Sequence, residues 1–216
     1  YSLIHDDLPC MDNDKLRRGK PSAHIKFGES TAVLAGNSLL TMAFEILSFD
    51  GFNLNKKIKN SLINKISQCS GHLGIAGGQY LDLDFENKKI SKKRIIEMEI
   101  KKTGKLFSFC CAAPLIIKNK DLREIKKFEK IGSDIGLLFQ VADDLIDYKG
   151  KSSIVGKQTG KDKKKGKATL ISLLGYKNTI KYAHNLILKI NNNIKKYGSK
   201  SKELSKTLSF ILNREK

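Results

Sequence analysis

Four aspartates lie close together near the start of the chain, and two arginines follow them at once. The acids are Asp6, Asp7, Asp12 and Asp14, and the arginines are Arg17 and Arg18. Carboxylates packed this closely raise one another's pKa, so a fold that keeps them together needs a compensating positive charge. Mg²⁺ is suitable, because it takes oxygen ligands and shares one or two carboxylates with substrate phosphates. Arginine offers a planar fork that matches phosphate oxygens. The segment therefore predicts a metal-dependent clamp for a diphosphate.

The spacing of Asp6 and Asp12 predicts a break in the helix that carries them. Six residues correspond to about 240° around an α-helix, so the two carboxylates could not share a metal from one straight helix. Pro9 lies between them, and a proline inside a helix removes a hydrogen bond and clashes with the preceding turn. We expect the helix that begins near Tyr1 to end or bulge near Pro9, which turns Asp12 back toward Asp6. The competing interpretation is a solvated acidic loop.

A second acidic cluster lies more than a hundred residues further on, in FQVADDLID (139–147). Asp143 and Asp147 are four residues apart and therefore share one helical face. Gln140 falls on the same face. The other positions around these acids are apolar, unlike a run of charge that faces solvent. Two aspartate clusters far apart in the sequence suggest the two walls of one cavity, although neither cluster would be decisive alone.

Six short motifs in a fixed order carry a resemblance to a known family. They are DDLPCMD (6–12), LRRGKPS (16–22), GGQYLDL (77–83), KTGKL (102–106), FQVADDLID (139–147) and GKQTGKDKKKGKAT (156–169). This order resembles the trans-prenyltransferases, or polyprenyl synthases, and most closely the bacterial short-chain farnesyl diphosphate synthases. The resemblance covers nearly all 216 residues. The first motif has the two-residue insert of the bacterial enzymes, here Pro9 and Cys10.

The resemblance implies an all-α fold of the isoprenoid-synthase type, a helical bundle around a central cavity. It implies the head-to-tail condensation of isopentenyl diphosphate with an allylic diphosphate (dimethylallyl or geranyl), which yields farnesyl diphosphate and diphosphate. Two or three Mg²⁺ ions, bound with the substrate diphosphate, would be the cofactor. Geranyl and geranylgeranyl diphosphate are alternative products. A terpene cyclase is less favoured, because an enzyme with one substrate does not need a doubled diphosphate site.

The resemblance also gives roles to individual residues. Metal ligands would be Asp6, Asp12 and Asp143, with Asp7 and Asp147 as further candidates. Diphosphate binding would fall to Arg17, Lys102 and Lys157 for the allylic substrate and to Arg18 for the isopentenyl partner.

Three further positions act on the allylic carbon or on the length of the product. Thr103 and Gln140 would join Lys102 as catalytic residues, because their oxygens can stabilise an allylic cation in a water-excluded site. Gly104 allows a distortion of the helix at this point. The ring of Tyr1, roughly one helical turn before Asp6, would form the floor of the pocket and stop chain elongation early.

The formal charge of +19 supports a rival interpretation, a basic protein that binds nucleic acid. However, only five of the 41 basic side chains are arginines, and two of these lie beside the first aspartate cluster. Arginine is the usual residue for reading guanine edges. The lysines instead scatter with asparagine over segments such as 55–64 and 189–200. We therefore expect a solvated, lysine-rich surface and no specific nucleic acid partner.

The elements that must position the site show helical periodicity and no convincing strand alternation. We expect a helix over 30–49 that is buried on most sides, an amphipathic helix over 55–74, and a helix from Ser91 that kinks or ends near Pro114. A helix capped by Asp121 should carry the second cluster, and a basic loop over 150–167 should follow it. Amphipathic helices over 177–197 and 201–214 should complete the bundle.

Composition favours a single catalytic domain over residues 1–216. The longest apolar run that we expect, residues 106–117, is too short to span a bilayer, and no signal peptide is visible. The four cysteines have neither metal-type spacing nor a disulfide framework, which fits the reducing cytoplasm. The chain opens directly on the first motif, so the amino-terminal helices that carry part of the isopentenyl site in the family are expected to be absent from it. A homodimer is also implied by the resemblance.

Overall fold

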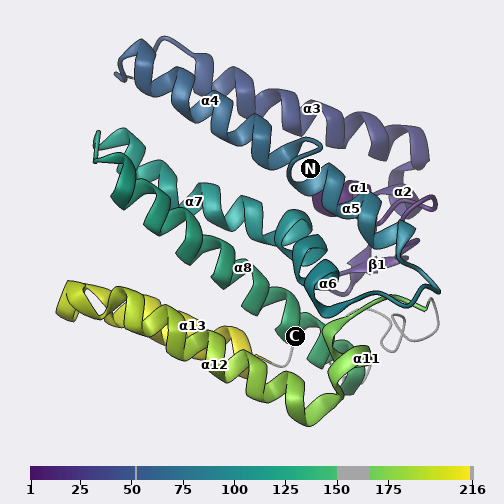
Figure 1. Ribbon diagram of the computed structural model, residues 1–216. Helices are drawn as coiled ribbons and strands as arrows, with labels where there is room; N and C mark the ends of the chain where they lie inside the picture. Colours follow the sequence, from purple (N-terminus) through teal and green to yellow (C-terminus); the bar gives the residue numbers. More distant parts are fainter. Residues whose placement is uncertain (52, 150–165, 215–216) are drawn as a thin grey trace.

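The computed structural model describes residues 1–51, 53–149 and 166–214. Its long helices form three paired layers (Figure 1). The pairs are α3 (Glu29–Ser48) with α4 (Lys56–Ser70), α7 (Lys105–Ile117) with α8 (Leu122–Lys149), and α12 (Tyr176–Ile194) with α13 (Lys202–Asn213). Helix α8 is the central element, because it packs against α7 on one side and against α12 and α13 on the other. The all-α fold class is confirmed.

Shorter elements gather at one end of these layers (Figure 1). They are α1 (Ser2–Asp6), α2 (Ala23–Phe27), α5 (Ile75–Asp84), α6 (Lys92–Glu99) and α11 (Leu170–Leu174). A π-helical turn, η1 (Ile100–Gly104), joins α6 to α7, and a 3₁₀ segment, η2 (Lys195–Ser201), joins α12 to α13. The described residues also contain one antiparallel pair of two-residue strands, β1 (Leu16–Arg17) and β2 (Lys20–Pro21). Strands this short give no alternation that a sequence pattern could reveal.

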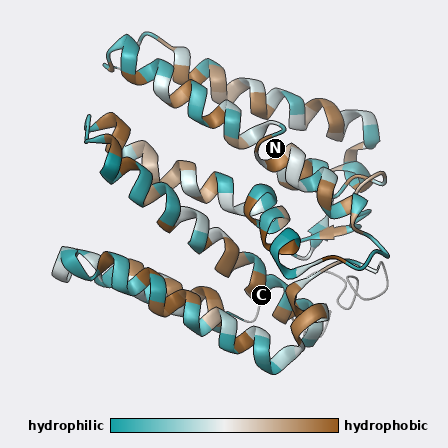
Figure 2. Ribbon diagram, in the orientation of Figure 1, coloured by the Kyte–Doolittle hydropathy of each residue, from teal (hydrophilic) through white to brown (hydrophobic). Residues whose placement is uncertain are grey.

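The main hydrophobic core lies between α8 and the α12–α13 pair. Leu138 and Val141 of α8 and Ile190 of α12 are completely buried there. Figure 2 shows hydrophobic stretches along these helices, as expected for amphipathic helices that bury one face. Because the second aspartate motif lies on α8, this core fixes the position of its acids.

Several predicted helix boundaries are confirmed. The Asp121 carboxylate accepts a hydrogen bond from the backbone N–H of Glu124 at 2.9 Å, which caps the start of α8. Helix α7 ends at Ile117, within one turn of Pro114. The predicted distortion at Gly104 is the π-helical turn η1. Asp121, Pro114 and Gly104 each lie within a few residues of the helix end or distortion that they specify, which is why the sequence alone predicts these positions.

Helix α3 corrects two predictions. It is a helix as expected, but along it only Ala32 and Gly36 are buried, whereas Leu34, Met42 and Ile46 are 48–64% exposed. The prediction of a helix buried on most sides is wrong, because α3 packs against its neighbours along one side only. By length and composition alone, α3 is also the one helix among the described residues that could cross a membrane. The expectation that no apolar run has this length is therefore wrong.

Candidate active site

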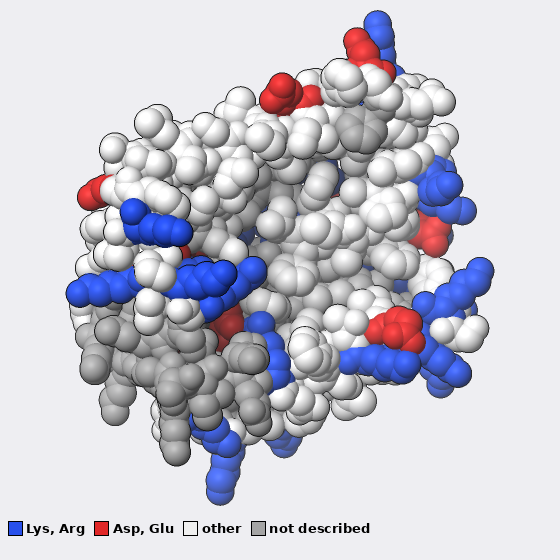
Figure 3. Space-filling view, turned by 180° about the vertical axis from the view of Figure 1, so that it is seen from behind, with Lys and Arg blue, Asp and Glu red and all other residues white. Residues whose placement is uncertain are grey.

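A cavity of about 490 Å³ opens at the end of the bundle where the short elements gather, and both aspartate clusters line it. Asp6 and Asp12 come from the first cluster, and Asp143, Asp144 and Asp147 come from the second. Figure 3, which looks at the face opposite to that of Figure 1, shows a hollowed surface with charged side chains at its edge. The prediction that the two clusters share one hollow is confirmed.

The backbone of the first motif folds back on itself, as Pro9 predicts. Helix α1 ends at Asp6, and the backbone N–H of Asp12 donates to the carbonyl of Asp6 at 2.8 Å. The N–H of Asn13 then donates to the carbonyl of Leu8 at 3.0 Å. Asn13 has a φ of 50°, in the left-handed region that asparagine adopts more readily than most residues. This turn brings the Asp12 backbone against the end of the helix that carries Asp6.

The two adjacent acids of the first motif face different surroundings. Burial raises the pKa of Asp6, Lys102 and Arg17 oppose the rise, and Asp12 adds to it. Asp7 is 2% exposed and does not line the cavity. Its two oxygens accept from Nε of Arg17, each at 3.1 Å, and Nη2 of Arg17 donates to it as well. Asp6 is therefore the one of these two that faces the cavity, and the predicted role of Asp7 as a ligand lacks support from this placement.

A buried ion-pair network joins three segments of the chain beside the first motif. Nζ of Lys102, on the π-helical turn, donates to Oδ2 of Asp82 at 2.7 Å. Nζ of Lys167 donates to Oδ1 of Asp12 at 2.6 Å and to Oδ2 of Asp82 at 3.1 Å. Burial alone would raise the pKa of Asp82, but the two lysines outweigh burial and hold it below the ordinary value. The motif that contains Asp82, GGQYLDL (77–83), did not by itself predict this ion-pair role.

The predicted cation-stabilising pair is brought together. Oγ1 of Thr103 donates to Oε1 of Gln140 at 3.1 Å, and Nε2 of Gln140 donates to Oδ1 of Asp144 at 3.1 Å. Both Thr103 and Gln140 line the cavity. The two partners fix the orientation of the Gln140 amide, with its oxygen toward Thr103. Gly136 makes this contact between helices possible, since a Cβ there would lie 2.5 Å from the Cα of Gly104.

Arg214, near the end of the described residues, binds the second motif and was not anticipated. Its Nη2 donates to Oδ1 of Asp143 at 2.5 Å and to the carbonyl of Phe139 at 3.3 Å. The guanidinium carbon also lies 3.8 Å from the centre of the Phe139 ring, a cation–π contact. Sequence spacing gave no signal for this pair, because the two charges lie 71 residues apart.

The remaining predicted residues fall in different places. Tyr1 lines the cavity, and its hydroxyl donates to the carbonyl of Ser70 at 3.4 Å. Arg17 and Lys102 also line the cavity. Arg18 is exposed and is not part of the cavity wall, so its role as an isopentenyl ligand stays a prediction. Lys157 lies outside the described residues.

The acids suit a magnesium ion only if a diphosphate completes the site. Within the described ranges, no three histidine, cysteine or acidic side chains converge closely enough to hold a metal ion by themselves. Asp6, which has a raised pKa from burial and neighbouring acids, and Asp12 offer hard oxygen ligands from one cluster. Asp143 and Asp147 offer them from the other. Since Mg²⁺ usually takes one or two carboxylates plus substrate phosphates, these residues fit it.

Comparison with known proteins gives one consistent result. The sequence model described as "Polyprenyl synthetase" matches residues 1–210. The farnesyl diphosphate synthase of Micrococcus luteus is 38% identical over 216 residues, which cover 100% of this chain and 74% of that protein. That of Bacillus subtilis is 41% identical over 81% of this chain and 59% of its own length. A geranyltransferase of Helicobacter pylori, solved with magnesium and isoprenyl diphosphate, superposes with a TM-score of 0.86 at 37% identity, over 99% of this chain and 69% of that one.

Proposed function

Because this chain belongs to the polyprenyl synthetase family, we propose that it is a farnesyl diphosphate synthase. It would condense isopentenyl diphosphate head-to-tail with dimethylallyl or geranyl diphosphate. The observation that carries the proposal is the single cavity lined by Asp6 and Asp12 from one motif and by Asp143 from the other. Geranyl and geranylgeranyl diphosphate are the alternative products.

Two or three magnesium ions bound by Asp6, Asp12 and Asp143 together with the diphosphate would supply Lewis-acid neutralisation of the leaving group. The basic side chains of the cavity add positive charge at the same place. Lys102, Lys167 and Arg17 line it, and each lies within hydrogen-bond distance of an acid. A diphosphate that enters the cavity therefore meets side chains already held in place. Lys157 and Arg18 complete the proposed set of diphosphate ligands.

The apolar part of the wall protects a carbocation from water. Ile75, Leu106 and Phe107 line the cavity beside Thr103 and Gln140. As the carbon–oxygen bond of the allylic substrate ionises, the oxygens of Thr103 and Gln140 stabilise the cation in a site from which water is excluded. The double bond of isopentenyl diphosphate then attacks the allylic carbon. The departing diphosphate accepts the proton that is lost, so no side chain has to act as the base.

A homodimer in the cytoplasm is part of the proposal. The exposed apolar side chains of α3 form a surface that a second copy can cover, and an isologous contact between two such helices would bury them. They are Val33, Leu34, Leu39, Met42 and Ile46. All four cysteines are free, which fits a reducing compartment.

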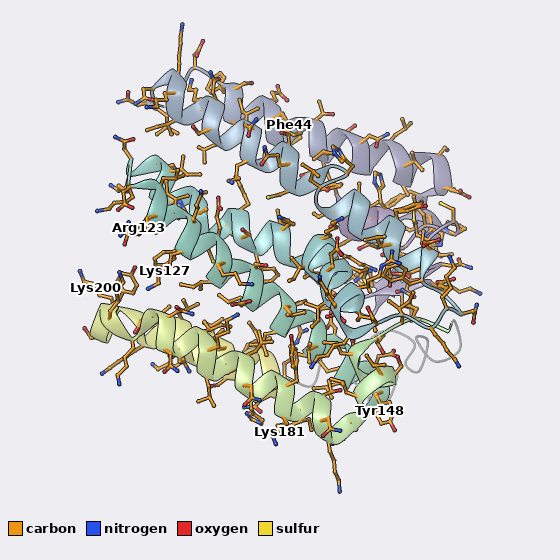
Figure 4. The ribbon with its side chains drawn as sticks, in the orientation of Figure 1. Phe44, Arg123, Lys127, Tyr148, Lys181 and Lys200 are labelled. Atoms are coloured by element: carbon orange, nitrogen blue, oxygen red, sulfur yellow. The ribbon has the colours of Figure 1, made fainter. Side chains whose placement is uncertain are left out.

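The lysine excess is consistent with a solvated surface and no specific nucleic acid partner. Lys181 projects from the outer side of α12, and Arg123, Lys127 and Lys200 lie at the end of the bundle remote from α11 (Figure 4). None of these four lines the cavity. Retention of duplex DNA by the chain at physiological salt, with no turnover of diphosphates, would favour the nucleic acid alternative.

The decisive experiment incubates the full-length protein with dimethylallyl diphosphate, isopentenyl diphosphate and Mg²⁺, and measures product length by chromatography and mass spectrometry. We expect a fifteen-carbon diphosphate, its loss in Asp6→Asn and Asp143→Asn, and no change in Lys181→Ala. A cyclic hydrocarbon formed from an allylic diphosphate alone would favour a terpene cyclase. Failure to bind inorganic diphosphate in the presence of Mg²⁺, measured by calorimetry, would overturn the proposal.

A further inference from the structure

Glu99 is a buried carboxyl group beside the site, and the proposed reaction does not use it. It is the last residue of α6 and directly precedes the π-helical turn that carries Lys102 and Thr103. Its side chain is 1% exposed, and Oε2 has no hydrogen-bond partner among the described residues. Burying an ionised carboxylate without a partner is costly. The placement therefore raises the question of what this acid does there.

The surroundings of Glu99 are acidic rather than basic. Asp144 of α8 and Asp82 of α5 are the charged neighbours that act on it most strongly, and the backbone N–H of Leu170 donates to its carboxyl group. The cations nearby, Lys102 and Lys167, are already bound by Asp82. A negative charge on Glu99 would thus meet two further acids, whereas a protonated carboxyl can donate a hydrogen bond to one of them.

A small internal cavity lies between Glu99 and both of these acids. It has a volume of about 40 Å³, and its lining includes Asp82, Glu99, Lys102, Gln140, Asp144 and Lys167. This is enough space for one water molecule and too little for a substrate. Since Asp82 already accepts from Lys102 and Lys167, Asp144 is the acid to which the proton of Glu99 can be donated, directly or through one water.

We propose that Glu99 is a neutral positioning residue that keeps Asp144 turned toward Gln140. Asp144 accepts from Nε2 of Gln140, and Oε1 of Gln140 accepts from Thr103, so the orientation of the amide depends on Asp144 remaining an acceptor. Loss of the donor at Glu99 would remove one contact that orients the Asp144 carboxylate, and the Gln140 amide would then be held less firmly with its oxygen toward Thr103. The inference rests on the proposed function, in which the oxygens of Gln140 and Thr103 face the allylic cation.

The electrostatics of the pocket agree with this geometry. Burial raises the pKa of Glu99 well above its ordinary value, and Asp144 and Asp82 raise it further. The titratable groups that face it are Asp82 on α5, Lys102 on η1, Asp144 on α8, Lys167 before α11 and Tyr182 on α12. The pKa of Tyr182 rises to about 12, first from burial and then from Glu99 and Asp134.

Stability as a function of pH tests the protonation state without any assay of turnover. An acid whose pKa is higher in the folded state makes the folded protein bind an extra proton, so stability falls as pH rises above about 4.3, the value in the unfolded chain. Glu99→Gln keeps the shape and one donor but cannot ionise. We expect its urea midpoint to equal that of the wild type near pH 4 and to exceed it at pH 8. A lower midpoint than the wild type at pH 8 would mean that Glu99 is an ionised partner of a lysine, which overturns the inference.

Turnover tests the positioning role. We expect Glu99→Gln to keep kcat within about twofold of the wild type and Glu99→Ala to lose roughly tenfold, with little change in KM. In a Thr103→Val background the further loss from Glu99→Ala should disappear, because both act through Gln140. Equal turnover of Glu99→Ala and the wild type would overturn the positioning role. Absence of product from the wild type would count against the proposed function alone, since the stability measurement still reports on Glu99.

The matched control for both measurements is Glu97→Gln. Glu97 lies two residues earlier on α6, is exposed, and forms an ion pair with Lys101 at 3.4 Å. The same chemical change there should leave the pH dependence of the urea midpoint and kcat unaltered. A shift in Glu97→Gln as large as that in Glu99→Gln would mean that the effect follows overall charge, and the inference would fail.

Discussion

Nζ of Lys167 lies 2.6 Å from Oδ1 of Asp12, although 155 positions separate the two residues in the sequence. The contact joins the segment that follows the undescribed residues 150–165 to the turn of the first motif. The positively charged ammonium group of Lys167 thus lies beside Asp12, an acid that we propose binds magnesium. A diphosphate bound with magnesium at Asp12 would meet the same ammonium group. Lys167 is therefore expected to have two partners, Asp12 in this structure and the diphosphate of the bound substrate.

Replacement of Lys167 by alanine tests this double role. We expect Lys167→Ala to lower kcat by about 100-fold, since loss of one preorganised charge at a leaving group has effects of this order. Steady-state kinetics with geranyl and isopentenyl diphosphates measure the change. Lys181→Ala removes an exposed lysine from the outer side of α12 and should retain wild-type kcat. Equal rates in the two variants would remove Lys167 from the site.

Thr103→Val removes a hydroxyl and keeps the shape of the side chain. Gln140 then loses its donor at 3.1 Å, and the proposed allylic cation would lose one oxygen dipole. We expect kcat to fall by roughly tenfold to 100-fold with KM within about threefold, because the interaction is made mainly in the transition state. Thr103→Ser retains the hydroxyl and should keep most of the activity. A rise in KM at constant kcat would instead mean that Thr103 binds the ground state.

Asp82→Asn tests the buried ion-pair network through stability. Two lysines would lose their charged partner, so we expect a loss of about 3 kcal/mol in the free energy of unfolding at pH 7. The pKa of Asp82 is lowered in the folded state, so its contribution is present above about pH 3.9 and is lost as pH falls through the folded value. Urea denaturation at pH 7 and at pH 3 should show the difference between variant and wild type shrinking at low pH. A constant difference would mean that packing, not charge, is lost.

Tyr1→Ala should lengthen the product. The ring lines the cavity one turn before Asp6, and its removal deepens the apolar pocket. We expect products of twenty or more carbons by mass spectrometry. Tyr1→Phe keeps the ring and loses only the hydroxyl that donates to Ser70, so it should still stop at fifteen. An unchanged distribution in Tyr1→Ala would exclude Tyr1 as the floor.

Leu34→Asp tests the α3 surface. Leu34 is 64% exposed in the single chain, and a charge there should not disturb the fold. If a second copy covers α3, sedimentation velocity should show a dimer for the wild type and a monomer for the variant. Lys57→Asp, an exposed position on α4, is the control for a change of charge. A wild-type monomer at micromolar concentration would contradict the proposed dimer.

Local signals explain what the sequence could predict. Pro9 between Asp6 and Asp12 indicated the turn, and the four-residue spacing of Asp143 and Asp147 indicated a shared helical face. Resemblance added Thr103 and Gln140, which the structure joins by a hydrogen bond.

Partners that depend on tertiary packing were not predictable. Arg214 is the clearest case, because nothing near it in the sequence indicates that it binds Asp143. Asp82 and Lys167 meet only because α5 and the segment before α11 lie side by side. The error over α3 has a different origin. An apolar, small-residue helix has the same composition whether its faces meet the core of its own chain or remain exposed.

The π-helical turn at residues 100–104 has a consequence for insertions and deletions. The π-helical turn contains one residue more than a regular α-helical turn, and this extra residue rotates the following helix by about 100° about the helix axis. Loss of any single residue there would let α6 and α7 fuse into one regular rod. Leu106 and Phe107 would then swing off the cavity wall that they now line. The number of residues at this junction is therefore constrained in addition to the identities of Lys102 and Thr103.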